Sequence, residues 1–262
     1  MYNFEFTKPS TVQEAVDALQ DDEAQALGGG QTLLPTMKQR LASPDTLVSL
    51  SGIPELVGVS IDGDTITIGG ATTHAQVAKE VASAFPALAA LAGGIGDPAV
   101  RNRGTIGGSL ANNDPAACYP AAVLGAGAIV VTNQREIDAD SYFEGMFETA
   151  LEDDEIITAV RFPIPASASY QKFLQPASRF ALVGVFVSKT SGGARVAVTG
   201  ASGDGVFRWT EAEAVLANGY DAAALNGMTL EDDDMIADLH GSAAYRAHLV
   251  GVMTRRAVTA ST

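Results

Sequence analysis

The N-terminal part of the chain alternates between helical and strand-like spacing of its hydrophobic positions. Apolar residues at positions 12, 15, 16 and 19 predict a helix over residues 11–19. Short strands are predicted over residues 25–27 and 46–50, with a helical turn over residues 35–41 between them. This order places the glycines at positions 28–30 between a strand and a helix, where backbone N–H groups have no helical partner.

A second unit is expected from about residue 53 to residue 165. Residues 57–61 and 65–68 alternate between apolar and polar positions and are joined by the sequence DGD, which predicts a hairpin with a tight turn. Helices are expected over residues 73–84 and 87–92 and within residues 115–127, and strands over residues 128–132 and 156–162.

The third unit follows a segment of different composition. Residues 163–169 are rich in proline, alanine and serine, which predicts a linker. Beyond it, residues 180–187 and 194–199 predict a hairpin, and residues 211–217 and 242–258 predict two helices. Strands followed by terminal helices indicate an α+β unit.

The charge balance limits the partners of this chain. Lys and Arg total 16 against 31 Asp and Glu, which gives a formal net charge of −15 at pH 7. A surface of this sign repels nucleic-acid phosphates, so we expect no nucleic-acid partner. No apolar run approaches the ~20 residues that a membrane span requires, and the first residues lack the pattern of a secretion signal. We therefore expect a cytoplasmic protein with no membrane span.

The cysteine count decides which redox centres the chain could carry. Cys118 is the only cysteine, so no disulfide can form within the chain. An iron–sulfur cluster normally takes four cysteine ligands, and one thiol does not supply them. The histidines at positions 74, 240 and 248 show no metal-ligand spacing. We predict no metal site, and this chain by itself cannot hold an iron–sulfur cluster.

Two glycine-rich segments are the candidates for ligand binding. Residues 28–35 read GGGQTLLP and residues 104–109 read GTIGGS, and neither contains lysine or arginine. Residues without a Cβ let the backbone approach a ligand closely and turn several N–H groups toward one anion. Glycine runs also occur in ordinary turns. Neither segment matches the G-x-G-x-x-G or G-x-x-x-x-G-K-[ST] motif, so a standard Rossmann or P-loop fold is not expected.

The longer strings around both segments resemble one protein family. ALGGGQTLLP at residues 26–35 and RNRGTIGGSLANNDP at residues 101–115 resemble the two FAD signatures of the molybdenum hydroxylases. More narrowly, they are similar to the medium, FAD-binding subunit of the carbon monoxide dehydrogenase and xanthine dehydrogenase family. The resemblance continues in FTKPSTVQEAV at residues 6–16, YQKF at residues 170–173 and DLHGSAAYR at residues 238–246.

The resemblance implies an α+β fold with FAD as the cofactor. A two-subdomain FAD-binding domain of the vanillyl-alcohol oxidase or PCMH type would span residues 1–165, with subdomains at about 1–52 and 53–165. A small C-terminal α+β domain would span residues 166–262. In this family the FAD pyrophosphate lies between the two glycine segments. The cofactor-binding residues implied here are Gly28, Gly29, Gly30, Gln31, Thr32, Leu33, Asn102, Gly104, Thr105, Ile106, Gly107, Gly108, Ser109, Asp114, Cys118, Tyr170 and Lys172.

Four of these residues have more specific expected roles. Asp114 either contacts FAD or caps a helix that begins at Pro115. Cys118 stands where many relatives carry an aspartate near the ribose or pyrophosphate, and the alternative is a small buried residue. The resemblance brings Tyr170 and Lys172 close to the flavin ring, where an ammonium group would raise the flavin potential. Lys172 could equally be a plain surface lysine.

These observations predict the FAD-carrying electron-transfer subunit of a three-part molybdenum hydroxylase, an oxidoreductase. The resemblance implies two partners, a large subunit with molybdopterin and a small subunit with two [2Fe–2S] clusters, assembled as a dimer of heterotrimers. The chain would pass electrons from the clusters to an external acceptor, so none of its residues is assigned a catalytic role toward the substrate. Two alternatives are a stand-alone FAD-dependent oxidoreductase, which needs an acid–base pair beside the flavin, and a non-catalytic flavin-binding or assembly module.

Overall fold

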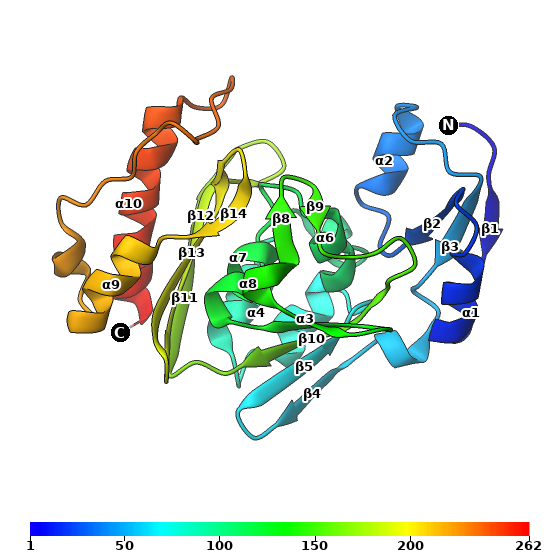
Figure 1. Ribbon diagram of the computed structural model, residues 1–262, viewed down its shortest axis with the longest axis horizontal. Coiled ribbons are helices and arrows are strands. Elements are labelled where there is room, and N and C mark those ends of the chain that lie inside the picture. Colours follow the sequence, from blue (N-terminus) through cyan, green and yellow to red (C-terminus); the bar gives the residue numbers. More distant parts are fainter. Residues whose placement is uncertain (262) are drawn as a thin grey trace.

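The computed structural model describes residues 1–261 and contains three main sheets, each with its own helices (Figure 1). The N-terminal sheet is parallel, in the order β1 (Glu5–Thr7), β3 (Thr46–Ser49) and β2 (Ala24–Leu27). Helix α1 (Val12–Ala18) begins after Thr11, whose side chain accepts a hydrogen bond from the Glu14 backbone N–H. Helix α2 (Leu33–Lys38) follows the first glycine segment directly, as the β-α-β pattern predicted.

The central sheet is antiparallel and has five strands. Its order is β4 (Val59–Asp62), β5 (Thr65–Gly69), β10 (Ile157–Pro163), β6 (Ile129–Thr132) and β7 (Glu136–Asp138). Its core is shared with the helices α3 (His74–Glu80), α4 (Pro86–Gly93), α6 (Ile106–Asn112) and α7 (Tyr119–Ala126). The short helix α5 (Pro98–Arg101) has no buried residue. Smaller elements complete this unit, namely η1 (Pro54–Leu56), α8 (Ala139–Tyr142), β8 (Phe143–Gly145) and β9 (Glu148–Thr149).

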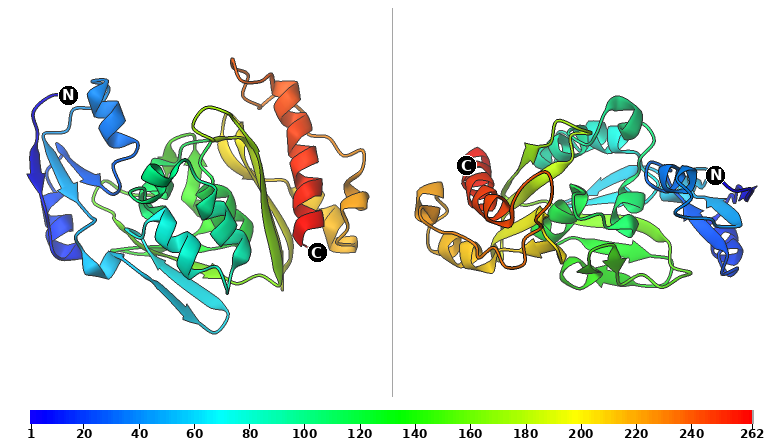
Figure 2. Two further views of the ribbon diagram at one scale, coloured as in Figure 1. Left: turned by 180° about the vertical axis from the view of Figure 1, so that it is seen from behind. Right: turned by 90° about the horizontal axis from the view of Figure 1, so that it is seen from above.

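The C-terminal sheet is a four-stranded antiparallel meander. Its order is β11 (Ser167–Leu174), β12 (Ala181–Thr190), β13 (Gly193–Ser202) and β14 (Gly205–Arg208). Phe186 and Ala197 on one face join the central core beside α7, every residue of which is buried. The other face packs on α9 (Thr210–Asn218), η2 (Ala222–Leu225) and α10 (Ala243–Ser261). Figure 2 shows this unit and the N-terminal sheet at opposite ends of the molecule.

The α+β fold is confirmed, and three local expectations are corrected. Residues 106–112, for which the sequence predicted no helix, form helix α6, so most of the second glycine segment is helical. The helix expected from Pro115 begins at Tyr119, because the Asp114 carboxylate instead accepts a hydrogen bond from the Ala116 N–H (2.8 Å) in a tight turn. The expected linker shrinks to residues 164–166 between β10 and β11. Among the described residues, no helix is both long and apolar enough to cross a bilayer.

Candidate functional site

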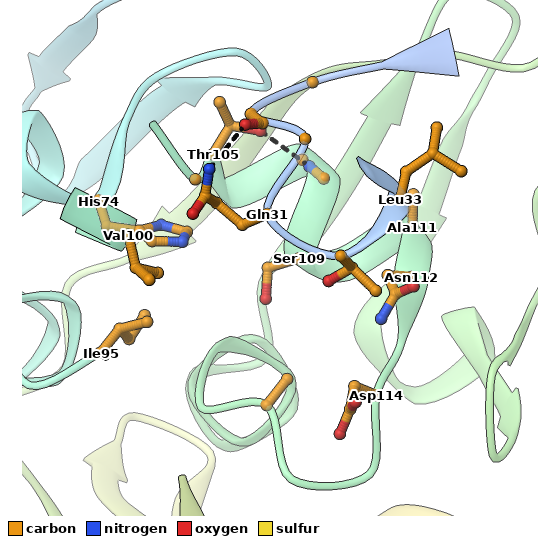
Figure 3. Close-up of a pocket in the computed structure, with 18 of the residues that line it drawn as sticks. Gln31, Leu33, His74, Ile95, Val100, Thr105, Ser109, Ala111, Asn112 and Asp114 are labelled. Carbon is orange, nitrogen blue, oxygen red and sulfur yellow. Dashed lines mark hydrogen bonds between the residues drawn. The ribbon is translucent and has the colours of Figure 1, made fainter. Parts of the chain in front are cut away.

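A cavity of about 690 Å³ lies where the three units meet (Figure 3). Its walls come from both glycine segments, from the start of α3, from residues 151–157 and from the C-terminal unit at residues 172–180. This volume is typical of sites for organic cofactors, roughly 300–1,000 Å³. Among the described residues, Lys172 and Arg179 are the only cationic ones in the lining, and both come from the C-terminal unit. The glycine segments therefore face the cavity without a positive side chain.

The first glycine segment presents a row of unpaired backbone donors. Within the part of the chain that the structure describes, no acceptor pairs with the N–H groups of residues 28–33. Gly30 has a φ of 69°, a left-handed conformation that favours glycine. The Gln31 side-chain amide donates to the Gly29 carbonyl oxygen (3.1 Å) and so braces the turn (Figure 3). Consecutive free N–H groups around a turn of this kind bind anions, and a pyrophosphate suits them.

The second glycine segment uses its N–H groups within the protein. The N–H of Ile106 donates to Thr72 O (3.2 Å), and the N–H of Gly107 donates to Gly70 O (2.8 Å). The Thr105 hydroxyl caps α6 by accepting from the Gly108 N–H (3.1 Å). The prediction of a second row of free backbone donors was therefore wrong. This segment offers side chains instead, and Figure 3 shows Ser109 and Asn112 at the cavity wall.

Both segments contain glycines at which the backbone packs directly against another stretch of backbone, so that a side chain would not fit. A Cβ on Gly29 would lie 2.0 Å from the carbonyl oxygen of Arg103, and a Cβ on Gly107 would lie 2.6 Å from the carbonyl oxygen of Gly70. Real Cβ atoms do not approach backbone atoms so closely. The glycine-rich composition thus serves the contact between the segments as well as the approach of a ligand.

His74 is a cavity residue that sequence reasoning placed in no functional role. It stands at the start of α3 with 5% of its surface exposed, and its ring lies against Tyr119 at 5.3 Å between centroids. Burial, with a smaller effect from the Arg101 charge, lowers the pKa of His74 to about 4, so the imidazole is neutral at pH 7. A Cβ on Gly104 would lie 2.5 Å from His74 Nε2, so glycine leaves room for the ring.

Comparison with known proteins decides the family. Residues 2–165 match the family model described as the FAD binding domain in molybdopterin dehydrogenase. The chain belongs to this family. This confirms the resemblance found in the sequence and the cofactor that it implied, FAD.

Relatives of this FAD-binding family extend the match beyond residue 165. The nicotine 6-hydroxylase medium subunit of Paenarthrobacter nicotinovorans is 36% identical over 97% of this chain and 95% of that protein. The carbon monoxide dehydrogenase medium chain of Afipia carboxidovorans is 32% identical over 98% of this chain and 96% of that protein. The solved structure of reconstituted CO dehydrogenase from Oligotropha carboxidovorans contains a chain with 31% identity and a TM-score of 0.89, covering 100% of this chain and 99% of that one.

All but three of the residues predicted to bind FAD line the cavity. Asn102 ends helix α5 on the exposed side, and Ile106 is fully buried in the core. The Tyr170 hydroxyl is buried against the third sheet, where a Cβ on Gly184 would meet it at 2.4 Å. These three side chains stand outside the cavity wall, because α5, α6 and β11 turn them away from it.

Several lining residues were missed because their signals are not local. Ile95 and Val100 form an apolar part of the wall beside His74 (Figure 3). Glu155 belongs to an acidic run, EDDE, that resembles an ordinary solvated loop. Hydrogen bonds from Arg135 nevertheless hold it, and they lower the pKa of Glu155 to about 2. No sequence pattern shows that Glu155 is buried and lines the cavity.

Thr105 links the stability of α6 to the cavity. Its hydroxyl caps α6, and a Cβ on Gly28 of the facing segment would lie 2.9 Å from the same hydroxyl oxygen. Replacing Thr105 by valine removes the cap, so we expect thermal unfolding to show a loss of about 1–2 kcal/mol and FAD titration to show weaker binding. Thr105→Ser keeps the hydroxyl and is the control. Equal FAD affinity in the valine and serine variants would contradict this role.

Proposed function

We propose that this chain is the FAD-carrying electron-transfer subunit of a three-part molybdenum hydroxylase. The observation that carries the proposal is the row of unpaired N–H groups at residues 28–33, set in a cavity of cofactor size. Two relatives that match nearly the whole chain are named a medium subunit and a medium chain, which supports the role of one subunit among several. The proposed partners are a molybdopterin-containing large subunit and a small subunit with two [2Fe–2S] clusters, in a cytoplasmic dimer of heterotrimers.

The residues of this chain would bind and orient the cofactor. The N–H groups of residues 28–33 would hold the pyrophosphate, with Ser109 and Asn112 as polar side chains on the facing wall. The apolar surface of Ile95, Val100 and Phe180 would exclude water from the ring. Bound FAD supplies redox chemistry in steps of one or two electrons. Residues 1–165 would form the FAD-binding domain and residues 166–262 the C-terminal domain.

The alternative of a stand-alone oxidoreductase needs an acid–base pair beside the flavin. His74 and Glu155 are titratable residues of the wall, but their pKa values of about 4 and about 2 lie far from neutral pH. A general acid or base works best when its pKa is near the working pH. Glu155 is also tied to Arg135 by two hydrogen bonds of 2.8 Å. These two residues are therefore poorly suited to proton transfer to a small substrate.

Reconstitution tests the proposal. The purified chain is expected to bind one FAD and to remain inactive toward carbon monoxide, aldehydes, purines and N-heterocycles. Mixing it with the proposed iron–sulfur and molybdenum subunits should restore reduction of its flavin by substrate, followed at the flavin absorbance. Oxidation of a small substrate by the chain alone would overturn the proposal in favour of a stand-alone enzyme. A chain that never takes up FAD would favour an assembly module.

A further inference from the structure

Two cations bind backbone carbonyls of residues 94–96, a loop of which Ile95 and Gly96 line the cavity. Arg101 donates from Nη1 to the carbonyl oxygens of Ile95 (2.9 Å) and Gly96 (2.8 Å). Lys172 Nζ, on β11, donates to the carbonyl oxygen of the preceding residue, Gly94 (2.8 Å). Three successive carbonyls of one cavity-lining loop are therefore held by two positive charges from separate parts of the chain.

Lys172 also holds a second wall of the same cavity. Its Nζ donates to the carbonyl oxygen of Arg179 (3.0 Å) and to Cys118 Sγ (3.5 Å). An ammonium group has three N–H donors, and these three contacts use all of them. The sequence predicted that the Lys172 ammonium group lies near the flavin ring. In the structure this group instead donates to two backbone carbonyls and one thiol.

The turn fastened by Lys172 is strained. Ser178 and Arg179 have φ angles of 56° and 57°, a left-handed conformation that non-glycine residues adopt only where neighbouring contacts enforce it. Both residues line the cavity, and both are exposed to solvent. Besides the Lys172 contact, the turn is closed by a hydrogen bond from the Gln175 N–H to Phe180 O (3.0 Å). A strained turn with so few contacts opens readily when one of them is lost.

We propose that Lys172 and Arg101 are positioning residues that clamp the loop at residues 94–96 and the turn at residues 175–180 over one end of the cavity. Lys172 joins the two walls, whereas Arg101 holds only the loop. The clamp sets how tightly the cofactor is retained, through the shape of the cavity and without donating to the cofactor. The inference about retention rests on the proposed location of FAD, whereas the closure of the turn does not.

Limited proteolysis of the FAD-free chain tests the closure of the turn. Trypsin cuts after Arg179, whose carbonyl oxygen accepts the Lys172 hydrogen bond, so cleavage reports the open turn. In Lys172→Met we expect cleavage at Arg179 at least about tenfold faster than in the unmodified chain, because hydrogen bonds from a charged donor are lost. Arg101→Met should leave this cleavage unchanged. Lys79→Met, on the exposed end of α3, is the matched control.

Release of FAD, followed by its fluorescence after dilution, tests the clamp on the cofactor. Both Lys172→Met and Arg101→Met are expected to release FAD about tenfold faster, whereas Lys79→Met keeps the original rate. Adding Ser178→Gly to Lys172→Met should slow cleavage and release again, because glycine adopts the left-handed conformation without strain. Circular dichroism confirms that each variant is folded before it is compared.

Two outcomes would overturn the inference. Cleavage at Arg179 that is equally slow in Lys172→Met and in the unmodified chain would show that Lys172 does not close the turn. Normal FAD retention in Lys172→Met together with a lowered midpoint potential would assign its charge to the flavin ring. If cleavage accelerates while FAD release and the midpoint potential both stay unchanged, the clamp on the turn exists and the proposed location of FAD is wrong.

Discussion

Replacing Gly29 by alanine is expected to abolish FAD retention. The new Cβ would lie 2.0 Å from the carbonyl oxygen of Arg103 and 2.5 Å from its carbonyl carbon. That carbonyl cannot move freely, because the N–H groups of Arg103 and Gly104 both donate to Val100 O. The first segment must therefore shift away, and its row of donors moves with it. We expect FAD affinity to fall at least about 100-fold, equivalent to about 3 kcal/mol, in a fluorescence titration.

A matched glycine separates this contact from a general intolerance of alanine. Gly219 ends α9 in an extended conformation, and a Cβ placed on it meets no atom within 4 Å. Gly219→Ala should therefore bind FAD normally. Stoichiometric FAD in purified Gly29→Ala would falsify the role given to the contact between the two segments. Secondary structure measured by circular dichroism distinguishes a lost site from a lost fold.

Replacing Arg246 by methionine is expected to cause the largest loss of stability. The Arg246 guanidinium, 3% exposed, donates from Nη1 to Leu182 O (2.7 Å) and Gly200 O (2.6 Å). Its Nη2 donates to both carboxylate oxygens of Asp238 (2.9 Å each). Methionine fills the space but removes the guanidinium donors of two buried carbonyls and of the Asp238 carboxylate, which keeps only the backbone N–H groups of His240 and Gly241. We expect a loss of about 3 kcal/mol and a Tm lower by roughly 5–10 °C in thermal unfolding.

A surface arginine of the same helix is the control for this substitution. Arg256 lies exposed on the same helix, α10, and Arg256→Met should change the Tm by no more than about 1–2 °C. If the two variants unfold at the same temperature, the buried network around Arg246 contributes nothing measurable. Arg246→Lys is expected to recover only part of the loss, because an ammonium group cannot reach all of these acceptors.

The order of elements could be predicted because it depends on local patterns. The sequence alone shows the apolar spacing of α1 and the strand patterns of β2 and β3. The structure contains all three elements. The helix expected over residues 242–258 is observed as α10, Ala243–Ser261. Boundaries were less predictable, because the Asp114 carboxylate binds Ala116 and delays the start of α7. Short-range side-chain hydrogen bonds of this kind compete with helix formation.

The string DLHGSAAYR at residues 238–246 is part of the family resemblance, but the sequence alone does not explain what these residues do. The structure supplies one, since its first residue, Asp238, forms an ion pair with its last, Arg246. The Arg246 guanidinium then reaches carbonyls of β12 and β13, which lie more than forty positions earlier in the chain. The pair thus attaches the loop before α10 to the C-terminal sheet.

The sequence by itself determined the family, the cofactor and the lack of cysteine ligands for a metal cluster, because these depend on which residues are present and in what order. It did not determine how the two glycine segments are used. Residues 28–33 keep their N–H groups free, whereas those of Ile106 and Gly107 are taken by carbonyls of residues 70 and 72. The partners of Lys172 were equally hidden, since Gly94 is 78 positions away. A hydrogen bond between distant residues exists only after the chain has folded, so the tertiary structure alone decided which donors remain for a ligand.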